Sequence, residues 1–218
     1  MALIPCYECE KEISDKAEAC PHCGAPGEKD GVYKTYYESG KLERLATYKD
    51  GRLDGLLKEY NENGRLMDKV TFVAGEQDGP FERYHENGQL MEKGTCVAGL
   101  VDGLYESYHE NGQLKEKRTH VDGKQDGPYE QYDEIGQLES KGTYVADEPD
   151  GPFEDYHDYG QSGAKGTFVA GELDGPFERY HENGQLKEKG TYNMGEKCGE
   201  WIEDGETVTY DPCPDTED

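Results

Sequence analysis

Apolar and polar positions along the chain recur with a period of 24 residues, from residue 30 to residue 201. An Asp-Gly pair opens each unit; an aromatic or large aliphatic residue follows the Asp after three positions, and Tyr follows three positions later. The units open at Asp30, Asp54, Asp78, Asp102, Asp126, Asp150 and Asp174, and Cys198-Gly199 stands at the eighth place. A register that never slips predicts a structural repeat.

A second turn signal lies nine residues after each opening Asp. It reads Asn-Gly in four units, with Ser39-Gly40, Ile135-Gly136 and Tyr159-Gly160 as variants. Asn-Gly between strand-like segments predicts a two-residue type I′ turn, in which both residues take positive φ. Each unit is therefore expected to be one β-hairpin. Helix is a poor alternative, because Gly and turn pairs recur too often for a 3.6-residue period.

The expected loop also predicts which residues face each other across a hairpin. With Asn87-Gly88 as the loop, the numbers of cross-strand partners sum to 175, so that Phe81 faces Gly94 and Tyr84 faces Met91. The same arithmetic pairs Tyr129 with Gly142, Phe153 with Gly166, Phe177 with Gly190, Tyr33 with Ala46, Leu57 with Val70 and Tyr105 with Arg118. Aromatic rings are thus expected to cover strand glycines. Because the two aromatic positions lie three apart, a bulge or a two-sided sheet is required.

Four of the seven cysteines form two Cys-x-x-Cys pairs near the N-terminus: Cys6, Cys9, Cys20 and Cys23. Four thiolates in this spacing predict a closed, structural zinc site, and the alternative is two unrelated thiol pairs. A thioredoxin-like motif fits poorly, since neither pair follows a long apolar strand. Cys96, Cys198 and Cys213 lack a nearby His-plus-acid arrangement and are expected to be free thiols.

The composition adds a constraint that the pattern must overcome. Only 33% of residues are hydrophobic and the net charge is −26, which is typical of disordered chains, but 17 Tyr and 29 Gly suit a hairpin protein. No apolar run approaches the roughly 18 residues of a membrane span. The first residues do not form a long signal core, and paired cysteines suit a reducing compartment, so we expect a cytoplasmic protein.

The pattern Asp-Gly-x-aromatic-x-x-Tyr-x-x-x-Gly-x-Leu-x-x-x-Gly-Thr-Tyr resembles the MORN repeat, in the variant form common in bacterial proteins, from about Asp30 to Trp201. The sixth unit departs from it at Tyr159-Gly160-Gln161-Ser162, where local packing is expected to differ. The resemblance implies an elongated single-layer antiparallel meander. The bacterial variant is often labelled an antitoxin component, whereas eukaryotic relatives act as scaffolds or dimerisation elements. The first 25 residues resemble a bacterial zinc ribbon.

These observations predict an all-β chain with three parts. Residues 1–27 are expected to form the zinc ribbon, residues 28–210 seven hairpin repeats with a partial C-terminal one, and residues 211–218 an acidic tail. One repeat position carries His85, His109, His157 and His181, which would form a column. Solvated side chains are the simpler interpretation of this column, and metal binding or pH sensing is the alternative.

No catalytic constellation is evident. The few serines occupy no nucleophile elbow and no phosphate-binding loop occurs, so we expect a protein that is not an enzyme. The excess of 49 acidic over 23 basic residues argues against binding to nucleic acid or to anionic membranes. It agrees either with a solubilising surface or with docking of a basic protein. Partner-binding candidates are the repeated tyrosines Tyr84, Tyr108, Tyr132, Tyr156 and Tyr180.

The leading hypothesis is a protein-binding module that presents an acidic, aromatic surface to a basic protein. Its specific form is an antitoxin or immunity role, in which that surface covers the nucleic-acid site of a basic toxin. The alternative is a structural scaffold that self-associates through its sheet edges.

Overall fold

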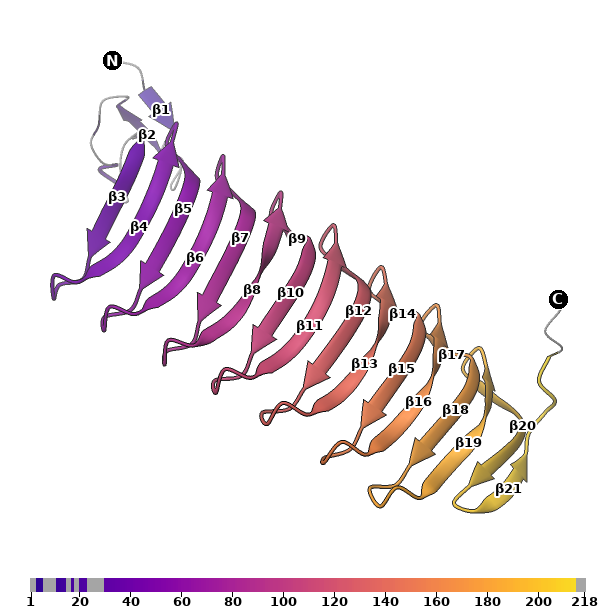
Figure 1. The fold of residues 1–218 in the computed structure, drawn as a ribbon. Coiled ribbons are helices and arrows are strands. Elements are labelled where there is room, and N and C mark those ends of the chain that lie inside the picture. The colour runs from indigo at the N-terminus through magenta and orange to yellow at the C-terminus, as the bar shows by residue number, and fades with distance from the viewer. Residues whose placement is uncertain (1–2, 6–10, 15–16, 18–19, 23–29, 215–218) are drawn as a thin grey trace. The chain divides into compact units, whose positions relative to one another are not determined.

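The computed structural model describes residues 3–5, 11–14, 17, 20–22 and 30–214. All the regular secondary structure within these ranges is β-strand (Figure 1). No helix there is long and apolar enough to cross a bilayer. The chain divides into two compact units, Met1–Leu100 and Val101–Asp218.

The first unit contains a short N-terminal pair and three hairpin repeats. β1 (Leu3–Pro5) and β2 (Glu12–Ser14) pair antiparallel. The repeats follow as β3 (Gly31–Tyr36), β4 (Leu42–Lys49), β5 (Arg52–Tyr60), β6 (Leu66–Val73), β7 (Glu76–Tyr84) and β8 (Leu90–Val97). Each of these six strands pairs antiparallel with the next.

The second unit contains four more repeats and a terminal hairpin, and the two residues of β9 (Leu100–Val101) lie on either side of the unit boundary. Its strands are β10 (Gly103–Tyr108), β11 (Leu114–Val121), β12 (Lys124–Tyr132), β13 (Leu138–Val145), β14 (Glu148–Pro149), β15 (Gly151–Tyr156), β16 (Ser162–Val169), β17 (Glu172–Leu173), β18 (Gly175–Tyr180), β19 (Leu186–Asn193), β20 (Glu196–Glu203) and β21 (Glu206–Thr209). The nineteen strands from β3 to β21 are strands of antiparallel sheet. The prediction of an all-β array of hairpin repeats is therefore confirmed. The irregular sixth repeat also folds as a hairpin, with β15 paired to β16.

The turn at Asn-Gly is a three-residue loop, and the prediction of a type I′ turn there was wrong. In the third repeat the Gly88 N–H donates to His85 O and the His85 N–H donates to Gln89 O, both at 2.8 Å. Gly88 has φ +90°, whereas Asn87 does not take positive φ, as in a type I turn followed by a G1 bulge. The additional loop residue shifts the register, so that Tyr84 pairs with Leu90 rather than with Met91.

Type I′ turns occur instead between successive repeats. Ala74 and Gly75, with φ of +51° and +96°, join β6 to β7, and their flanking residues Val73 and Glu76 pair. The opening Asp-Gly pair does not form a tight turn. Asp78-Gly79 lies within β7 beside a register shift, whereas Asp102, Asp150 and Asp174 each stand between two short strands. The opening Asp caps the next type I′ turn: Asp54 accepts the Ala74 N–H at 3.2 Å, 20 residues along the chain. The same bond recurs in the first, third, fifth, sixth and seventh repeats, as in Met194 N–H to Asp174 at 3.4 Å.

The core lies on one face of the sheet, where aromatic rings cover glycines as predicted. Phe81 pairs with Gly94, and the other predicted partners are also confirmed: Tyr129 with Gly142, Phe153 with Gly166, Phe177 with Gly190, Tyr33 with Ala46, Leu57 with Val70 and Tyr105 with Arg118. The sheet is two-sided. Arg83 lies over the Phe81 ring, whereas Tyr84 shares the opposite face with Glu82, to which its hydroxyl donates.

The C-terminal hairpin closes the aromatic face of the second unit. Trp201 on β20 is fully buried against Phe177, Tyr192 and Tyr210. Backbone hydrogen bonds from Gly199 to Asp211 O and from Tyr210 to Gly199 O bring the following segment against β20. Cys213 is thereby placed next to Cys198, and the two form a disulfide with Cα atoms 4.9 Å apart.

This disulfide corrects the expectation of free thiols at Cys198 and Cys213. Spacing alone did not reveal it, because the pairing depends on how the segment after β21 folds back. The third cysteine, Cys96, is a free thiol buried in the first unit, as predicted.

Candidate functional site

The five tyrosines predicted to bind a partner form one repeated contact. Each is half-buried, and each hydroxyl donates to the carboxylate of the glutamate two residues earlier on its own strand. The bonds are Tyr84 to Glu82 (2.5 Å), Tyr108 to Glu106 (2.8 Å), Tyr132 to Glu130 (3.0 Å), Tyr156 to Glu154 and Tyr180 to Glu178. Burial and the neighbouring Glu82 raise the pKa of Tyr84 to about 12. These hydroxyls are thus engaged within the chain.

The glutamates also belong to a ladder of alternating charge across the strands. We call it the charge ladder; it comprises Lys69, Glu82 and Lys93 in the first unit and Glu106, Lys117, Glu130, Lys141, Glu154, Lys165, Glu178 and Lys189 in the second. Within each unit its members are consecutive cross-strand pairs, a placement that favours opposite charges. The tyrosine face is therefore close to neutral, and the acidic excess lies elsewhere.

Glu178 shows how tightly the ladder holds its carboxylates. Lys165 Nζ lies 2.7 Å and Lys189 Nζ 3.0 Å from its two oxygens, and Tyr180 also donates to it. The hydrogen bond from Lys165 first, and those from Tyr180 and Lys189 next, lower the pKa of Glu178 to about 2. Three donors on one carboxylate keep it ionised, which makes it a structural group rather than a general acid.

The histidine column lies where each hairpin enters its three-residue loop. Three of these imidazoles reach the next repeat: His109 Nε2 donates to Tyr132 O at 2.9 Å, His157 Nε2 to Tyr180 O at 2.8 Å, and His181 Nε2 lies 3.2 Å from Asp204. Among the residues that the structure describes, no three His, Cys, Asp or Glu side chains are grouped to hold a metal ion. The column therefore links neighbouring hairpins.

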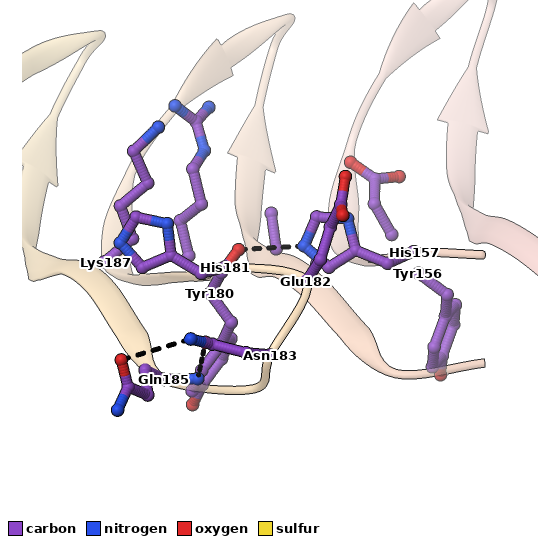
Figure 2. A pocket seen from close by; sticks show the side chains of 12 residues that line it. Tyr156, His157, Tyr180, His181, Glu182, Asn183, Gln185 and Lys187 are labelled. Atoms are coloured by element: carbon purple, nitrogen blue, oxygen red, sulfur yellow. Dashed lines mark hydrogen bonds between the residues drawn. The ribbon is translucent and has the colours of Figure 1, made fainter. Parts of the chain in front are cut away.

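A groove of about 800 Å³ lies beside His157 and His181 (Figure 2). It opens where Gly163 and Ala164 replace the long side chains found in other repeats, as at Lys187 in the seventh. A Cβ on Gly163 would lie 3.3 Å from Asp155 O, so the backbone approaches closely here.

The charges around this groove are mixed. Asp155 pairs with Ala164, which pairs on its other side with Arg179. Partial burial raises the pKa of Asp155, and the nearby Arg179 opposes that rise. Glu182 and Lys187 line the same groove, which therefore carries groups of both signs.

A second groove, of about 430 Å³, lies at the loops of the fifth and sixth repeats. Ile135 and Tyr159 line it and occupy the loop position that is Asn in four other repeats. Their exposed fractions are 69% and 86%. We call this the turn-tip groove. The sequence shows Ile135 and Tyr159 as turn variants, but its pattern does not predict the groove.

A family model for the MORN repeat variant matches six segments of the chain: residues 29–50, 53–74, 77–95, 101–122, 125–146 and 173–194. Together they cover more than half of the sequence. The chain belongs to the MORN repeat variant family. The sixth MORN repeat, which begins at Asp150, is not among the matched segments, in agreement with its departure from the pattern. A comparison with curated proteins gives no match.

The predicted zinc ligands lie mostly outside the described part of this MORN protein. That holds for Cys6, Cys9 and Cys23, whereas Cys20 is described and buried. The His22 backbone N–H points to Cys20 Sγ at 3.4 Å. Cys20 Sγ thus accepts one backbone hydrogen bond at the start of the second Cys-x-x-Cys pair.

Two features of the MORN repeats carried a sequence signal that we did not use. Glu and Lys alternate at fixed repeat positions, as in Glu154 and Lys165, so the ladder follows from hairpin pairing. The replacement of the loop Asn by Ile135 and Tyr159 places apolar side chains at a solvated loop position, which is the sequence signal of the turn-tip groove.

Proposed function

We propose that this MORN repeat protein is a non-enzymatic protein-binding module whose partner is a basic protein. The observation that carries the proposal is that apolar side chains are exposed among carboxylates at the hairpin loops. The aromatic residues on the core face of the sheet are instead packed against one another. The net charge of −26 supports a basic partner, because complementary charge accelerates encounter. The same charge opposes binding to nucleic acid or to anionic membranes.

The first experiment is a pull-down with the tagged full-length chain, followed by kinetic measurement with the purified partner. We expect a basic protein whose association slows markedly between 50 and 500 mM salt, as the Debye length falls from about 14 to about 4 Å, with little change in dissociation. An acidic partner, or association that is indifferent to salt, would show that the acidic surface serves solubility alone.

The specific form of the proposal is an antitoxin or immunity role. Here the acidic surface covers the nucleic-acid site of a basic toxin, as the label often given to the bacterial variant suggests. Co-expression tests it directly: the chain should restore growth to cells that produce the partner. A partner that does not impair growth removes this version and leaves the binding module intact.

A scaffold that self-associates through its sheet edges is the alternative. Among the described strands, β3 pairs with β4 alone and β21 with β20 alone, so each has one unpaired edge. Open edges can add strands from another chain. Sedimentation velocity distinguishes the two functions, because edge pairing gives oligomers that grow with protein concentration.

We also propose one zinc ion per chain, held by Cys6, Cys9, Cys20 and Cys23 in a closed, structural site. The paired spacing supports it. We also propose a cytoplasmic location, because paired Cys-x-x-Cys thiols suit a reducing compartment. The Cys198–Cys213 disulfide weighs in the other direction, since such bonds persist mainly in oxidising compartments.

A further inference from the structure

Two loop residues break the rule that the other repeats follow. Ile135 and Tyr159 are the two most exposed large apolar residues of the described chain, at 69% and 86%. At the same loop position Asn63, Asn87, Asn111 and Asn183 occur in the second, third, fourth and seventh repeats. Polar residues suit this solvated position, so burial within the fold does not explain the exceptions.

Local turn chemistry does not explain them either. The loop Asn normally caps its own turn, as Asn87 Oδ1 accepts the Gln89 N–H at 2.8 Å. In the fifth repeat Asp133 does this instead, accepting the Ile135 N–H at 2.9 Å and the Gln137 N–H at 2.8 Å. The turn therefore closes without any contribution from the Ile135 side chain.

The exceptional residue of the sixth turn, Tyr159, has a strained backbone. Tyr159 has φ +74°, a left-handed conformation that costs a residue other than Gly about 1–3 kcal/mol. Its repeat carries neither the loop Asn nor an Asp at the cap position, where it has His157. Asn or Gly adopts this conformation at lower cost, so the turn itself does not favour Tyr159.

The two side chains line a single groove. The fifth and sixth hairpins are neighbours, because β13 pairs with β15 through Ser140 and Asp155. Their loops therefore lie next to each other, and Ile135 and Tyr159 both line the turn-tip groove of about 430 Å³. Two apolar anchors at one groove are the arrangement from which interface hot spots are built.

Carboxylates dominate the remaining walls. Asp133, Glu134, Glu139 and Asp158 line the groove, and Lys115 is the one Lys or Arg among its lining residues. Apolar anchors within a charged rim are typical of a protein interface, and an acidic rim selects a basic partner. The larger groove beside His181, with charges of both signs, makes no such selection.

We propose that the turn-tip groove is the docking site for an aliphatic or aromatic side chain of a basic protein, flanked there by Lys or Arg. This inference rests on the proposed function and names its site. A second copy of this chain fits poorly, because it would bring the same four carboxylates to the contact.

The test uses the full-length chain and a displayed library of random 12-residue peptides. Peptides selected on the wild-type protein are synthesised, and their affinities are measured for wild type and for the variants Ile135→Asn, Tyr159→Asn and the double variant. Met194→Asn is the matched control, because Met194 is also an exposed apolar turn residue but belongs to a type I′ turn between repeats. Each variant restores or installs a favourable turn residue, so melting temperatures should not fall.

We expect enriched peptides with an apolar residue between Lys or Arg. Tyr159→Asn should weaken their binding about 30-fold, as for a hot-spot residue, and Met194→Asn less than twofold. The proposal is overturned if no peptide is enriched, if enriched peptides are not basic, or if the double variant binds equally well. Loss of a homodimer in the double variant would identify a second copy as the occupant instead.

The natural partner separates failure of the site from failure of the function. If the double variant still binds the partner recovered by pull-down with unchanged affinity, the protein-binding function stands and the turn-tip groove is not its site. If no basic partner binds wild type at all, the proposed function fails as well.

Discussion

Gly190 lies beneath the ring of Trp201 in the second unit. A Cβ at this position would lie 2.2 Å from two ring atoms of Trp201, whose exposed fraction is 0%. The ring cannot move freely, because its Nε1 donates to Thr191 O at 3.2 Å and to Cys198 O at 3.1 Å. The glycine is required here by close approach of a side chain rather than by its own backbone conformation.

Gly190→Ala should therefore destabilise the second unit by about 1–3 kcal/mol or more through overpacking. Two other covered glycines give a graded comparison, since a Cβ at Gly142 would lie 2.8 Å from Tyr129 and one at Gly166 3.0 Å from Phe153. Urea unfolding should rank the losses Gly190 first, then Gly142, then Gly166. Equal losses at all three positions would show that strand propensity, not ring contact, sets the cost.

At the scale of the strand, the charge ladder makes stability depend on pH. The pKa of Glu178 is lowered to about 2, from about 4.3 in an unfolded chain. A lowered folded pKa contributes stability that is fully present above about pH 4.3 and is lost as the pH falls through about 2. The tyrosine face should therefore lose stability as the pH falls from about 4.3 to about 2.

Glu178→Gln should cost about 1 kcal/mol at neutral pH, because the ion pairs lie near the surface, and should flatten the acid dependence of stability. Glu182→Gln, at an exposed loop position, is the control and should leave both nearly unchanged. Carboxyl ¹³C titration of the wild type reports the group itself. A Glu178 midpoint near 4.3 would contradict the geometry of the ladder.

The terminal hairpin depends on a covalent link as well as on pairing. Cys198–Cys213 closes a segment with a sequence separation of 15, for which chain entropy alone gives about 3 kcal/mol. Cys213→Ser should increase amide exchange in β21 and expose Trp201, which Tyr210 covers, while the first unit remains protected. Cys96→Ala tests whether any cysteine change has that effect. Alkylation in intact cells shows whether the bond exists there, and a reduced pair would agree with a cytoplasmic location.

At the scale of the whole molecule, zinc and the repeats should be separable. Elemental analysis is expected to give one zinc per chain, and a Cys20→Ser, Cys23→Ser double variant should lose it. Because repeat arrays are stabilised mainly by nearest neighbours, chelation should leave the fluorescence of Trp201 and the melting of the repeats unchanged. Absence of stoichiometric zinc, or full retention in the double variant, would remove the metal site.

The sequence by itself determined the features that follow from its 24-residue periodicity. The 24-residue spacing set the hairpin repeats, and pairing arithmetic placed Phe81 on Gly94 and Phe177 on Gly190. These pairs hold although the loop has three residues, because a bulge next to Tyr84 and Tyr180 restores the register. The predicted pairing of Tyr84 with Met91 failed because it depends on the turn type. Asn-Gly occurs both in type I′ turns and in type I turns with a bulge, which differ in φ.

Only the tertiary structure decided contacts between segments that lie far apart in the chain. The Asp54 cap on the Ala74 N–H spans 20 residues. The Cys198–Cys213 bond needs the segment after β21 to return to β20, and the turn-tip groove needs two loops to become neighbours. The cap joins the two strands of one hairpin and the disulfide depends on the fold-back after β21, whereas the groove depends on how one hairpin is placed against the next. None of these contacts follows from local propensity.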